Sequence, residues 1–331
     1  MAVHLPKGTR DLLPEQMIQR EQVIQTLTRI FVRYGFEPLQ TPAVERIETL
    51  TGKYGDDGEK LIFRVLKRGE AGKRGEVDLA LRYDLTVPLA RVVAMNADLR
   101  MPFKRYQVQP VWRADRPQKG RYREFYQCDI DTVGTRDGTA DAECLAVLQD
   151  ALSALGFEDF TIRLNHRGLL AAMVADAGVS DLEVSVLVAL DKLDKIGREG
   201  VDKELMERGV GPESRERLWT LLSVTGERAL DHLQAEIGEP AHQAISELRS
   251  VLGYARSMGV SDDHLLVDPT LARGLDYYTG PGFEAVVTEP KVGSIAGGGR
   301  YDGLVGMFGK REVPAVGISL GLERILVVME E

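Results

Sequence analysis

The order of strand-like and helix-like segments is the feature that most limits the fold. From Arg167 to Met258 the chain is rich in Leu, Val, Glu, Arg and Lys and has a helical pattern, whereas strand-like runs lie on both sides. This order indicates a helical module inserted into a sheet domain. The strands show no regular alternation with helices, which favours an antiparallel α+β domain over a doubly wound one. We therefore predict a sheet domain of residues 1–165 and 262–331, with a helical insertion at 166–261.

Apolar periodicity predicts the individual elements outside the insertion. Apolar residues recur at three- and four-residue intervals from Leu13 to Tyr34, as in an amphipathic helix. The next segment, residues 35–42, is limited by two prolines and is expected to be extended, on an edge or an interface. Residues 79–96 suggest a strand, a turn at Pro88 and a helix. Further strands are expected in the runs FTIRLN, HLLVDP, FEAVVTE, GSIAGGG and VPAVGISLG, with helices over 139–155 and from GLERI onward.

Length and composition exclude several classes of protein. The 331 residues, 44% of them hydrophobic, can bury one large core or two ordinary ones. No apolar run approaches the ~20 residues of a membrane helix, and the polar N-terminal segment MAVHLPKGTRDLLPEQ does not fit a signal peptide. We therefore expect a cytoplasmic protein with no membrane partner. Two cysteines provide neither a disulfide framework nor a zinc site, and no dedicated metal site is predicted.

A basic hairpin contrasts with the net charge of −9. Residues 103–113 and 121–131 read as two strands joined by the turn-rich connector ADRPQKG. Between Phe103 and Arg123 seven basic residues face one acid, Asp115, so the acidic average conceals a local positive field. Side chains of a strand alternate between its two faces, so the second strand places a ring, an amide and two carboxylates on one face. These side chains belong to Phe125, Gln127, Asp129 and Asp131.

The stretch LARGLDYYTGPGFE carries groups suited to an ionic ligand. Arg273 is a permanent cation whose fork matches a carboxylate or a phosphate. Asp276 needs a partner in an apolar interior, and Tyr277 and Tyr278 point to opposite faces if the segment is extended. A structural ion pair is the alternative. Together with the basic hairpin and the acid–threonine pair of RYDLT, the stretch suggests a ligand with a polyphosphate and an amine or imidazole.

The glycine-rich stretch GSIAGGGRYDG is not a known nucleotide loop. It lacks the Gly-Lys-Ser/Thr end of a P-loop, and Asp302 stands where the dinucleotide fingerprint needs glycine. Two interpretations remain open. Either the glycines allow strands to pack closely, or Gly297–Gly299 leave the backbone open so that a flat ligand can lie on it.

Several motifs, in order along the whole chain, resemble those of the histidyl-tRNA synthetases, a family of class II aminoacyl-tRNA synthetases. They are KGTRDLLP, RYDLTVPLAR, VWRADRPQKGRYREFYQCDID, LARGLDYYTG, GSIAGGGRYDGL and VGISLGLERI. The resemblance implies an antiparallel six-stranded sheet flanked by helices, a helical insertion, and a homodimer formed through the helix at 13–34 and the segment ending at Pro42. The family's C-terminal anticodon-binding domain is expected to be absent from this chain.

The resemblance also implies a role for each matching residue. In the amino-acid site, Asp84, Thr86 and Gln127 hold the histidine α-amino group, while Asp131 and Tyr278 read the imidazole and Tyr277 shapes the pocket. For ATP, Arg113 contacts the α-phosphate, Phe125 stacks on adenine, and Arg121 and Arg324 hold the outer phosphates. Arg273 stabilises charge at the reacting centre, together with Arg113. Mg²⁺ accompanies ATP.

Three functions are compatible with such a chain. The first is an enzyme, a histidine–tRNA ligase that forms histidyl-adenylate from histidine and ATP and charges tRNA(His). The second is a non-catalytic relative, the histidine-sensing regulatory subunit of ATP phosphoribosyltransferase, which shares the fold and lacks the anticodon domain. A generic RNA-binding module is the third, and it fits poorly because the basic residues concentrate in one loop. The arginines at 113, 121, 273 and 324 favour the enzyme, because a regulatory subunit does not need them.

Overall fold

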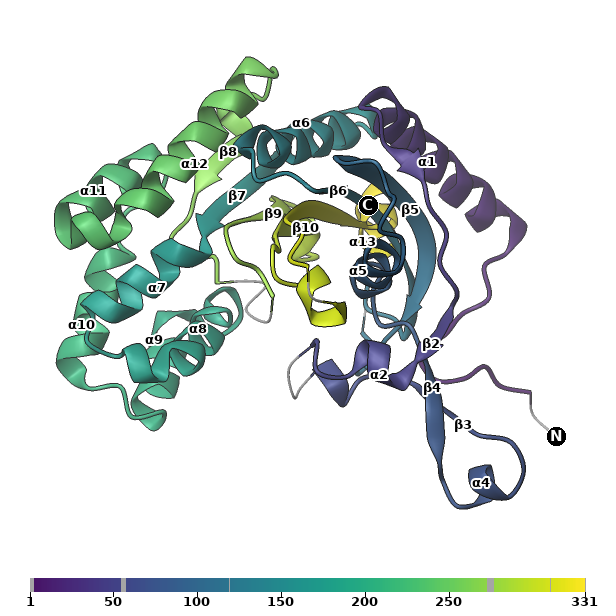
Figure 1. The fold of residues 1–331 in the computed structure, drawn as a ribbon. Helices are drawn as coiled ribbons and strands as arrows, with labels where there is room; N and C mark the ends of the chain where they lie inside the picture. The colour runs from purple at the N-terminus through teal and green to yellow at the C-terminus, as the bar shows by residue number, and fades with distance from the viewer. Residues whose placement is uncertain (1–2, 55–57, 119, 273–276, 310, 331) are drawn as a thin grey trace.

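A large mixed sheet forms the centre of the molecule (Figure 1). The computed structural model describes residues 3–54, 58–118, 120–272, 277–309 and 311–330. The sheet has eight strands in the order β1-β5-β6-β11-β10-β9-β7-β8. Their bounds are β1 Glu37–Pro38, β5 Phe103–Trp112, β6 Glu124–Val133, β7 Phe160–His166, β8 Leu265–Val267, β9 Pro281–Val287, β10 Ser294–Arg300 and β11 Ala315–Gly321.

The predicted antiparallel six-stranded sheet is wrong in its strand number and in being wholly antiparallel. The six strands from β5 to β7 are antiparallel to their neighbours. However, β1 pairs with β5 and β8 pairs with β7 in parallel, one at each edge. Both pairs join strands that are far apart in sequence, and such long connections allow the chain to return in the same direction. The α+β class is retained.

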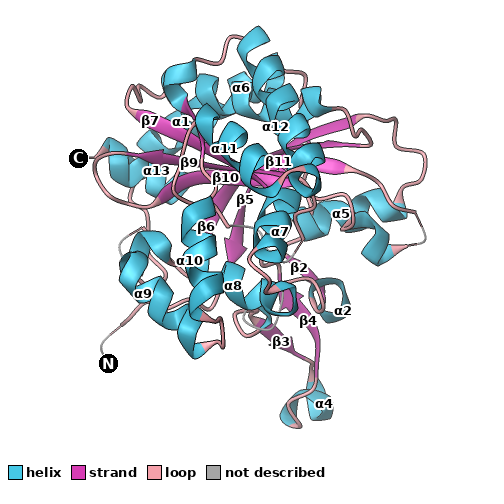
Figure 2. Ribbon diagram, turned by 90° about the vertical axis from the view of Figure 1, so that its left-hand side faces the viewer, coloured by secondary structure: helices cyan, strands magenta, loops and turns pink. Residues whose placement is uncertain are grey.

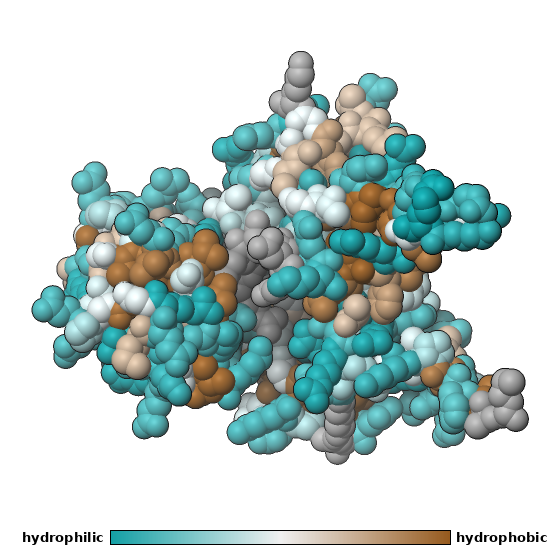
Figure 3. Space-filling model, turned by 90° about the horizontal axis from the view of Figure 1, so that it is seen from below, coloured by the Kyte–Doolittle hydropathy of each residue, from teal (hydrophilic) through white to brown (hydrophobic). Residues whose placement is uncertain are grey.

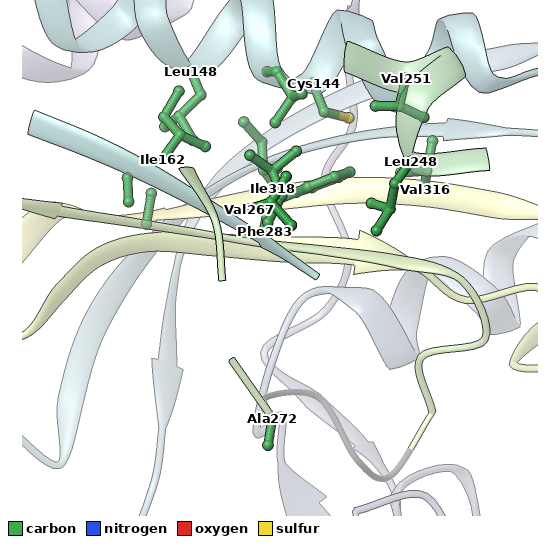
Figure 4. Close-up of a cluster of buried hydrophobic side chains, with 14 of the residues drawn as sticks. Cys144, Leu148, Ile162, Leu248, Val251, Val267, Ala272, Phe283, Val316 and Ile318 are labelled. Carbon is green, nitrogen blue, oxygen red and sulfur yellow. The ribbon is translucent and has the colours of Figure 1, made fainter. Parts of the chain in front are cut away.

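Helices cover one face of the large sheet. Figure 2 shows α1 (Pro14–Arg33), α6 (Gly138–Ala154) and α12 (Glu239–Ser257) above it. In Figure 4 Leu148 of α6 lies close to Ile162 of β7, and Leu248 of α12 lies close to Val316 of β11. All four side chains are buried. Both cysteines, Cys128 and Cys144, are also buried, and neither is in a disulfide. This apolar layer fixes the sheet and leaves its opposite face available for polar side chains.

A small sheet and short helices lie on the other side. Strands β2 (Val44–Arg46), β4 (Val77–Leu81) and β3 (Arg64–Leu66) pair in that order, and α2 (Ile47–Leu50), α4 (Gly69–Lys73) and α5 (Thr86–Met95) accompany them. The predicted turn at Pro88 is wrong, because Pro88 lies in the first turn of α5. A proline is tolerated there, since the backbone N–H groups of a first turn have no partner within the helix.

The segment between β7 and β8 is helical, as its composition predicts. It contains α7 (Arg167–Asp176), α8 (Glu183–Leu190), α9 (Leu193–Glu207), α10 (Pro212–Leu221), α11 (Glu227–Ile237) and α12. Buried residues of these helices, such as Leu187 and Leu205, belong to the same apolar cluster as the sheet residues. Within the described residues no helix is long and apolar enough to cross a membrane. The last helix, α13 (Leu322–Met329), follows β11 directly.

Candidate active site

A cavity of about 650 Å³ lies on the face of the large sheet opposite α6. Alternation along β6 creates this arrangement, because Cys128 and Ile130 belong to the apolar core while Gln127 and Asp129 line the cavity. Figure 3 views the molecule from this side, with the insertion helices on the left. The predicted division of the β6 side chains between two faces is therefore confirmed.

The structure brings the described candidate residues together in this one cavity. They come from the connection between β5 and β6, from β6, from the segment that leads into α5 and its first residue, from the segment before β9 and from α13. Arg273, the predicted catalytic arginine, and Asp276 lie outside the described residues. The cavity-lining candidates are Asp84, Thr86, Arg113, Arg121, Phe125, Gln127, Asp131, Tyr277, Tyr278 and Arg324.

One end of the cavity is cationic. Arg113 lies over the rings of Tyr83 and Phe125, 4.2 and 5.2 Å from their centroids, and its Nε donates to the Tyr83 carbonyl oxygen at 3.0 Å. Arg121 is half-exposed and pairs with Asp115 at 3.0 Å. Arg324 donates to the backbone oxygen of Ser294. These fixed guanidinium groups make this end suited to phosphate.

Arg105 differs from the other cations of the basic run. It lies on β5, in register with Asp131 of β6, and is completely buried. Its Nη2 atom is 2.7 Å from Asp131 Oδ2 and 4.0 Å from Asp129 Oδ2. In the sequence it belongs to the basic run 103–123, but its burial within the strand removes it from the surface field. It balances carboxylates under the cavity instead.

The other end of the cavity is anionic. Asp84 is buried, and its Oδ1 accepts hydrogen bonds from Tyr54 Oη and Val87 N, each at 3.0 Å. Burial raises its pKa. Asp131 accepts a hydrogen bond from the Tyr301 hydroxyl, and burial, partly offset by Arg105, raises its pKa to about 6. An ammonium or a ring N–H entering here meets carboxylates held in a dry environment.

The two adjacent tyrosines line the same cavity. Tyr277 and Tyr278 lie edge to face, with ring centroids 5.1 Å apart, and Tyr277 is 6.0 Å from Tyr301. The two residues are not in a strand, so the opposite orientation expected for an extended segment does not occur. This aromatic cluster can enclose a flat ring while the phenol groups supply hydrogen bonds.

Close strand packing accounts for part of the glycine motif. A Cβ at Gly298 would lie 2.6 Å from the Ile318 Cα, and one at Gly299 would lie 2.7 Å from the Pro281 oxygen. Gly317, opposite, has the Asp131 carboxylate against it. Gly297 alone of the triplet has room for a Cβ, 3.5 Å from the Phe283 oxygen, and it lines the cavity. The packing interpretation therefore holds for Gly298 and Gly299, and the open-floor interpretation stays a prediction for Gly297.

Sequence reasoning assigned no role to several residues that line the cavity. Asp129 was on the predicted face, so its spacing was already a signal. Tyr301 was inside the quoted glycine motif, without an assignment. Asp191 and Lys195 come from the insertion, where no motif marks them. Their place depends on tertiary contacts such as the ion pair of Asp194 with Arg163 on β7, at 2.7 Å.

No dedicated metal site is formed by the described residues. Among them, no three His, Cys, Asp or Glu side chains lie close enough to hold a metal ion. Asp115, near the cationic end, already pairs with Arg121, and Glu323 pairs with Arg20 at 2.8 Å. A metal ion at this end would therefore depend on the phosphate oxygens of its ligand.

Comparison with known proteins identifies the family. A family model described as histidyl-tRNA synthetase matches residues 8–325. The chain is 48% identical to histidine–tRNA ligase of Gloeobacter violaceus over 98% of its own length and 74% of the relative's. Among solved structures, histidyl-tRNA synthetase from Nostoc sp. PCC 7120 matches with a TM-score of 0.86 at 33% identity, over 99% of this chain and 75% of that one.

A second solved structure bears on the regulatory alternative. It is described as an ATP phosphoribosyltransferase regulatory subunit/histidyl-tRNA synthetase from Bacillus halodurans, with a TM-score of 0.84, 25% identity, and coverage of 99% of this chain and 83% of that one. The higher identities, over nearly the full chain, are to proteins named histidine–tRNA ligase. With the family model and the class II-like α+β fold, they show that this chain belongs to the histidyl-tRNA synthetase family.

Proposed function

We propose that this chain activates histidine with ATP, releasing pyrophosphate, and transfers the histidyl group to the 3′ end of tRNA(His). One observation carries the proposal: a single cavity has carboxylates at one end and guanidinium groups at the other. An α-amino acid offers an ammonium to the first end, and ATP offers a triphosphate to the second. The substrate carboxylate and the α-phosphate then meet between the two ends.

In the proposed amino-acid site, three residues hold the α-amino group. Asp84 and Gln127 accept its hydrogen bonds, and Thr86, the first residue of α5, adds a hydroxyl beside them. Tyr54 and Val87 fix the Asp84 carboxylate from behind. Asp131 and Tyr278 face the imidazole, and Tyr277 closes the pocket. The donors and acceptors therefore select histidine by its ring nitrogens.

In the proposed ATP site, Phe125 stacks on adenine and Arg113 contacts the α-phosphate. Arg121 and Arg324 hold the outer phosphates. Mg²⁺ bound to the phosphate oxygens of ATP would supply further positive charge there. Because these positive groups are fixed before the reaction, they stabilise developing negative charge at little reorganisation cost.

The chemical step needs alignment and charge more than an acid or a base. A carboxylate oxygen of histidine attacks the α-phosphorus, and the bond from that phosphorus to the bridging oxygen breaks. The electron pair leaves with pyrophosphate. Arg113, with Arg273, stabilises the charge on the phosphoryl oxygens. No covalent enzyme intermediate forms.

The remaining assignments concern assembly. We propose that residues 1–165 and 262–331 form the catalytic domain and that 166–261 form an inserted module. A homodimer would form through α1 and the segment that ends at Pro42.

Histidine-dependent exchange of pyrophosphate into ATP tests the function. Exchange is expected with histidine and not with other amino acids. Arg113→Ala and Arg273→Ala are each expected to reduce exchange by 100-fold or more, as loss of a charge-stabilising donor does, while histidine binding changes little. A wild-type chain that binds histidine without exchange would establish the regulatory function instead.

A further inference from the structure

Asp129 is a buried carboxylate with an unused oxygen at the cavity. The residue is 2% exposed and lines the cavity, and its Oδ1 makes no hydrogen bond within the described part of the chain. A buried charged oxygen without a partner costs stability. Such a group is therefore suited to a donor that arrives with the ligand.

The neighbouring carboxylate on the same strand face is already engaged by the protein. Asp131 Oδ1 accepts a hydrogen bond from Tyr301, and Asp131 Oδ2 lies 2.7 Å from the Arg105 guanidinium as an ion pair without hydrogen-bond geometry. Arg105 is 4.0 Å from Asp129, so one cation serves two carboxylates. Asp84 is a third buried carboxylate that lines the same cavity. This group of three carboxylates and Arg105 has an excess of negative charge, and Asp129 has the weaker contact with the guanidinium.

The order of side chains along β6 indicates which part of a ligand Asp129 meets. Phe125 lies at the ATP end, followed on the same face by Gln127, Asp129 and Asp131. The substrate carboxylate must face the α-phosphate, so the imidazole points away from ATP. Gln127 Oε1 also has no partner in the described residues, and as the nearer acceptor it suits the ammonium. Asp129 is the first carboxylate beyond it.

We propose that Asp129 is a further specificity-determining residue, whose Oδ1 accepts a hydrogen bond from a ring N–H of the bound histidine. The inference rests on the proposed function. Asp131 then contributes to histidine recognition in part by holding the floor of the pocket, through its contacts with Tyr301 and Arg105. Asp129 provides Oδ1, an acceptor without a hydrogen bond in the described residues, beside the hydrogen bond between its carboxylate and Ser319. Selection of an imidazole over an apolar ring of similar size follows, because an apolar ring leaves Oδ1 unpaired.

Calorimetric binding of histidine to Asp129→Asn tests the proposal. Affinity is expected to fall about 10- to 100-fold, the range for a hydrogen bond to a charged group. ATP affinity should stay within about twofold, because Asp129 lies outside the proposed phosphate site. Asp129→Ser, with a smaller side chain, should show the same pattern. Unchanged histidine affinity in both variants would overturn the proposal.

A ligand without the ammonium shows whether Asp129 Oδ1 accepts a hydrogen bond from the ring N–H or from the α-ammonium of histidine. Imidazolepropionate keeps the ring and the carboxylate of histidine but has no α-amino group. If Asp129 meets the ring, Asp129→Asn weakens imidazolepropionate by the same factor as histidine. If the loss disappears with this ligand, Asp129 contacts the ammonium and the ring assignment is wrong. A failure of pyrophosphate exchange in the wild type, with this binding pattern intact, would overturn the proposed function alone.

Ligand-free stability distinguishes a binding role from a structural one. A carboxylate that serves the fold should lower the thermal midpoint when it is replaced. Asp129→Asn is expected to leave the midpoint unchanged or raise it. A lowered midpoint with unaltered histidine affinity would show that Asp129 is a structural partner of Arg105.

Discussion

The guanidinium of Arg105 contacts the carboxylate of Asp131 beneath the cavity, with Nη2 2.7 Å from Oδ2 and almost no exposure of either side chain. Both residues lie on neighbouring strands in direct register. A buried pair of this kind contributes little net stability while intact, but loss of one partner leaves an uncompensated charge. The pair therefore fixes the pocket floor and makes it sensitive to substitution.

Arg105→Met is expected to reduce the free energy of unfolding by about 3–5 kcal/mol, as loss of one partner of a buried pair does. Urea denaturation measures the change. Adding Asp131→Asn to this variant should restore part of the loss, because the unpaired charge is removed. Arg74→Met is the control, since Arg74 pairs with Glu76 at the surface and should change stability by less than about 1 kcal/mol. No recovery in the double variant would show that the two charges are not coupled.

Asp129→Asn is expected to stabilise the ligand-free protein at pH 8 by roughly 1–3 kcal/mol, because it removes a buried negative charge that has an unpaired oxygen. Burial, the largest cause, raises the pKa of Asp129 from 3.8 to about 7. Between these values the folded chain keeps a proton that the unfolded chain releases. The protonated form of Asp129 is therefore favoured by the fold. The stability it contributes is fully present below about pH 4 and is lost as the pH rises to about 7, where the folded chain must carry the buried charge.

Thermal or urea unfolding of both proteins from pH 4 to pH 8 checks this dependence. The stability difference between Asp129→Asn and the wild type should increase with pH across that window and level off above pH 7. A difference that stays constant with pH would mean that Asp129 keeps an ordinary pKa.

The candidate residues that share one cavity could be grouped from the sequence because their signals are local. Alternation along the predicted strand 121–131 is sufficient to place Gln127 and Asp131 on one face, and the structure shows that they share a cavity with Arg113 and Tyr278. Whether a given carboxylate is free depends on residues distant in the chain. Asp131 is engaged by Tyr301, 170 positions away. Composition and spacing carry no information about such a contact, and the free oxygen of Asp129 was missed for this reason.

The pairing of the two edge strands, β1 and β8, also could not be predicted from the sequence. The extended, proline-limited segment after the first helix was predicted, and it includes β1. That this short strand pairs in parallel with β5 depends on how the intervening small sheet returns the chain. Parallel pairing at β8 likewise depends on the path of the insertion helices. A short strand contains too few residues to specify its partner or its direction.

Gly298→Ala and Gly297→Ala form a matched pair for the glycine floor. A Cβ at Gly298 overlaps the backbone of β11, so this variant should lose about 1–3 kcal/mol or more of stability. A Cβ at Gly297 makes ordinary contacts and enters the cavity, so that variant should fold normally but bind histidine or ATP less tightly. Thermal unfolding and calorimetry separate the two effects. Equal stability losses would contradict the difference in packing.

Arg163 on β7 offers a comparison of two ion pairs at one guanidinium. It contacts Asp268 and Asp194 at the same distance, 2.7 Å, but the Asp268 side chain is 7% exposed and that of Asp194 is 69% exposed. Asp268 also accepts hydrogen bonds from the backbone N–H and the hydroxyl of Thr270. Asp268→Asn should therefore cost roughly 3 kcal/mol, whereas Asp194→Asn should cost less than about 1 kcal/mol.

Urea unfolding at low and high salt measures both effects. The small cost of Asp194→Asn should disappear at 1 M NaCl, where the Debye length falls to about 3 Å and an exposed pair is screened. The cost of Asp268→Asn should persist, because solvent ions do not reach the buried pair. An equal response of the two variants to salt would contradict this difference, because the Asp194 pair would then be screened no more than the Asp268 pair.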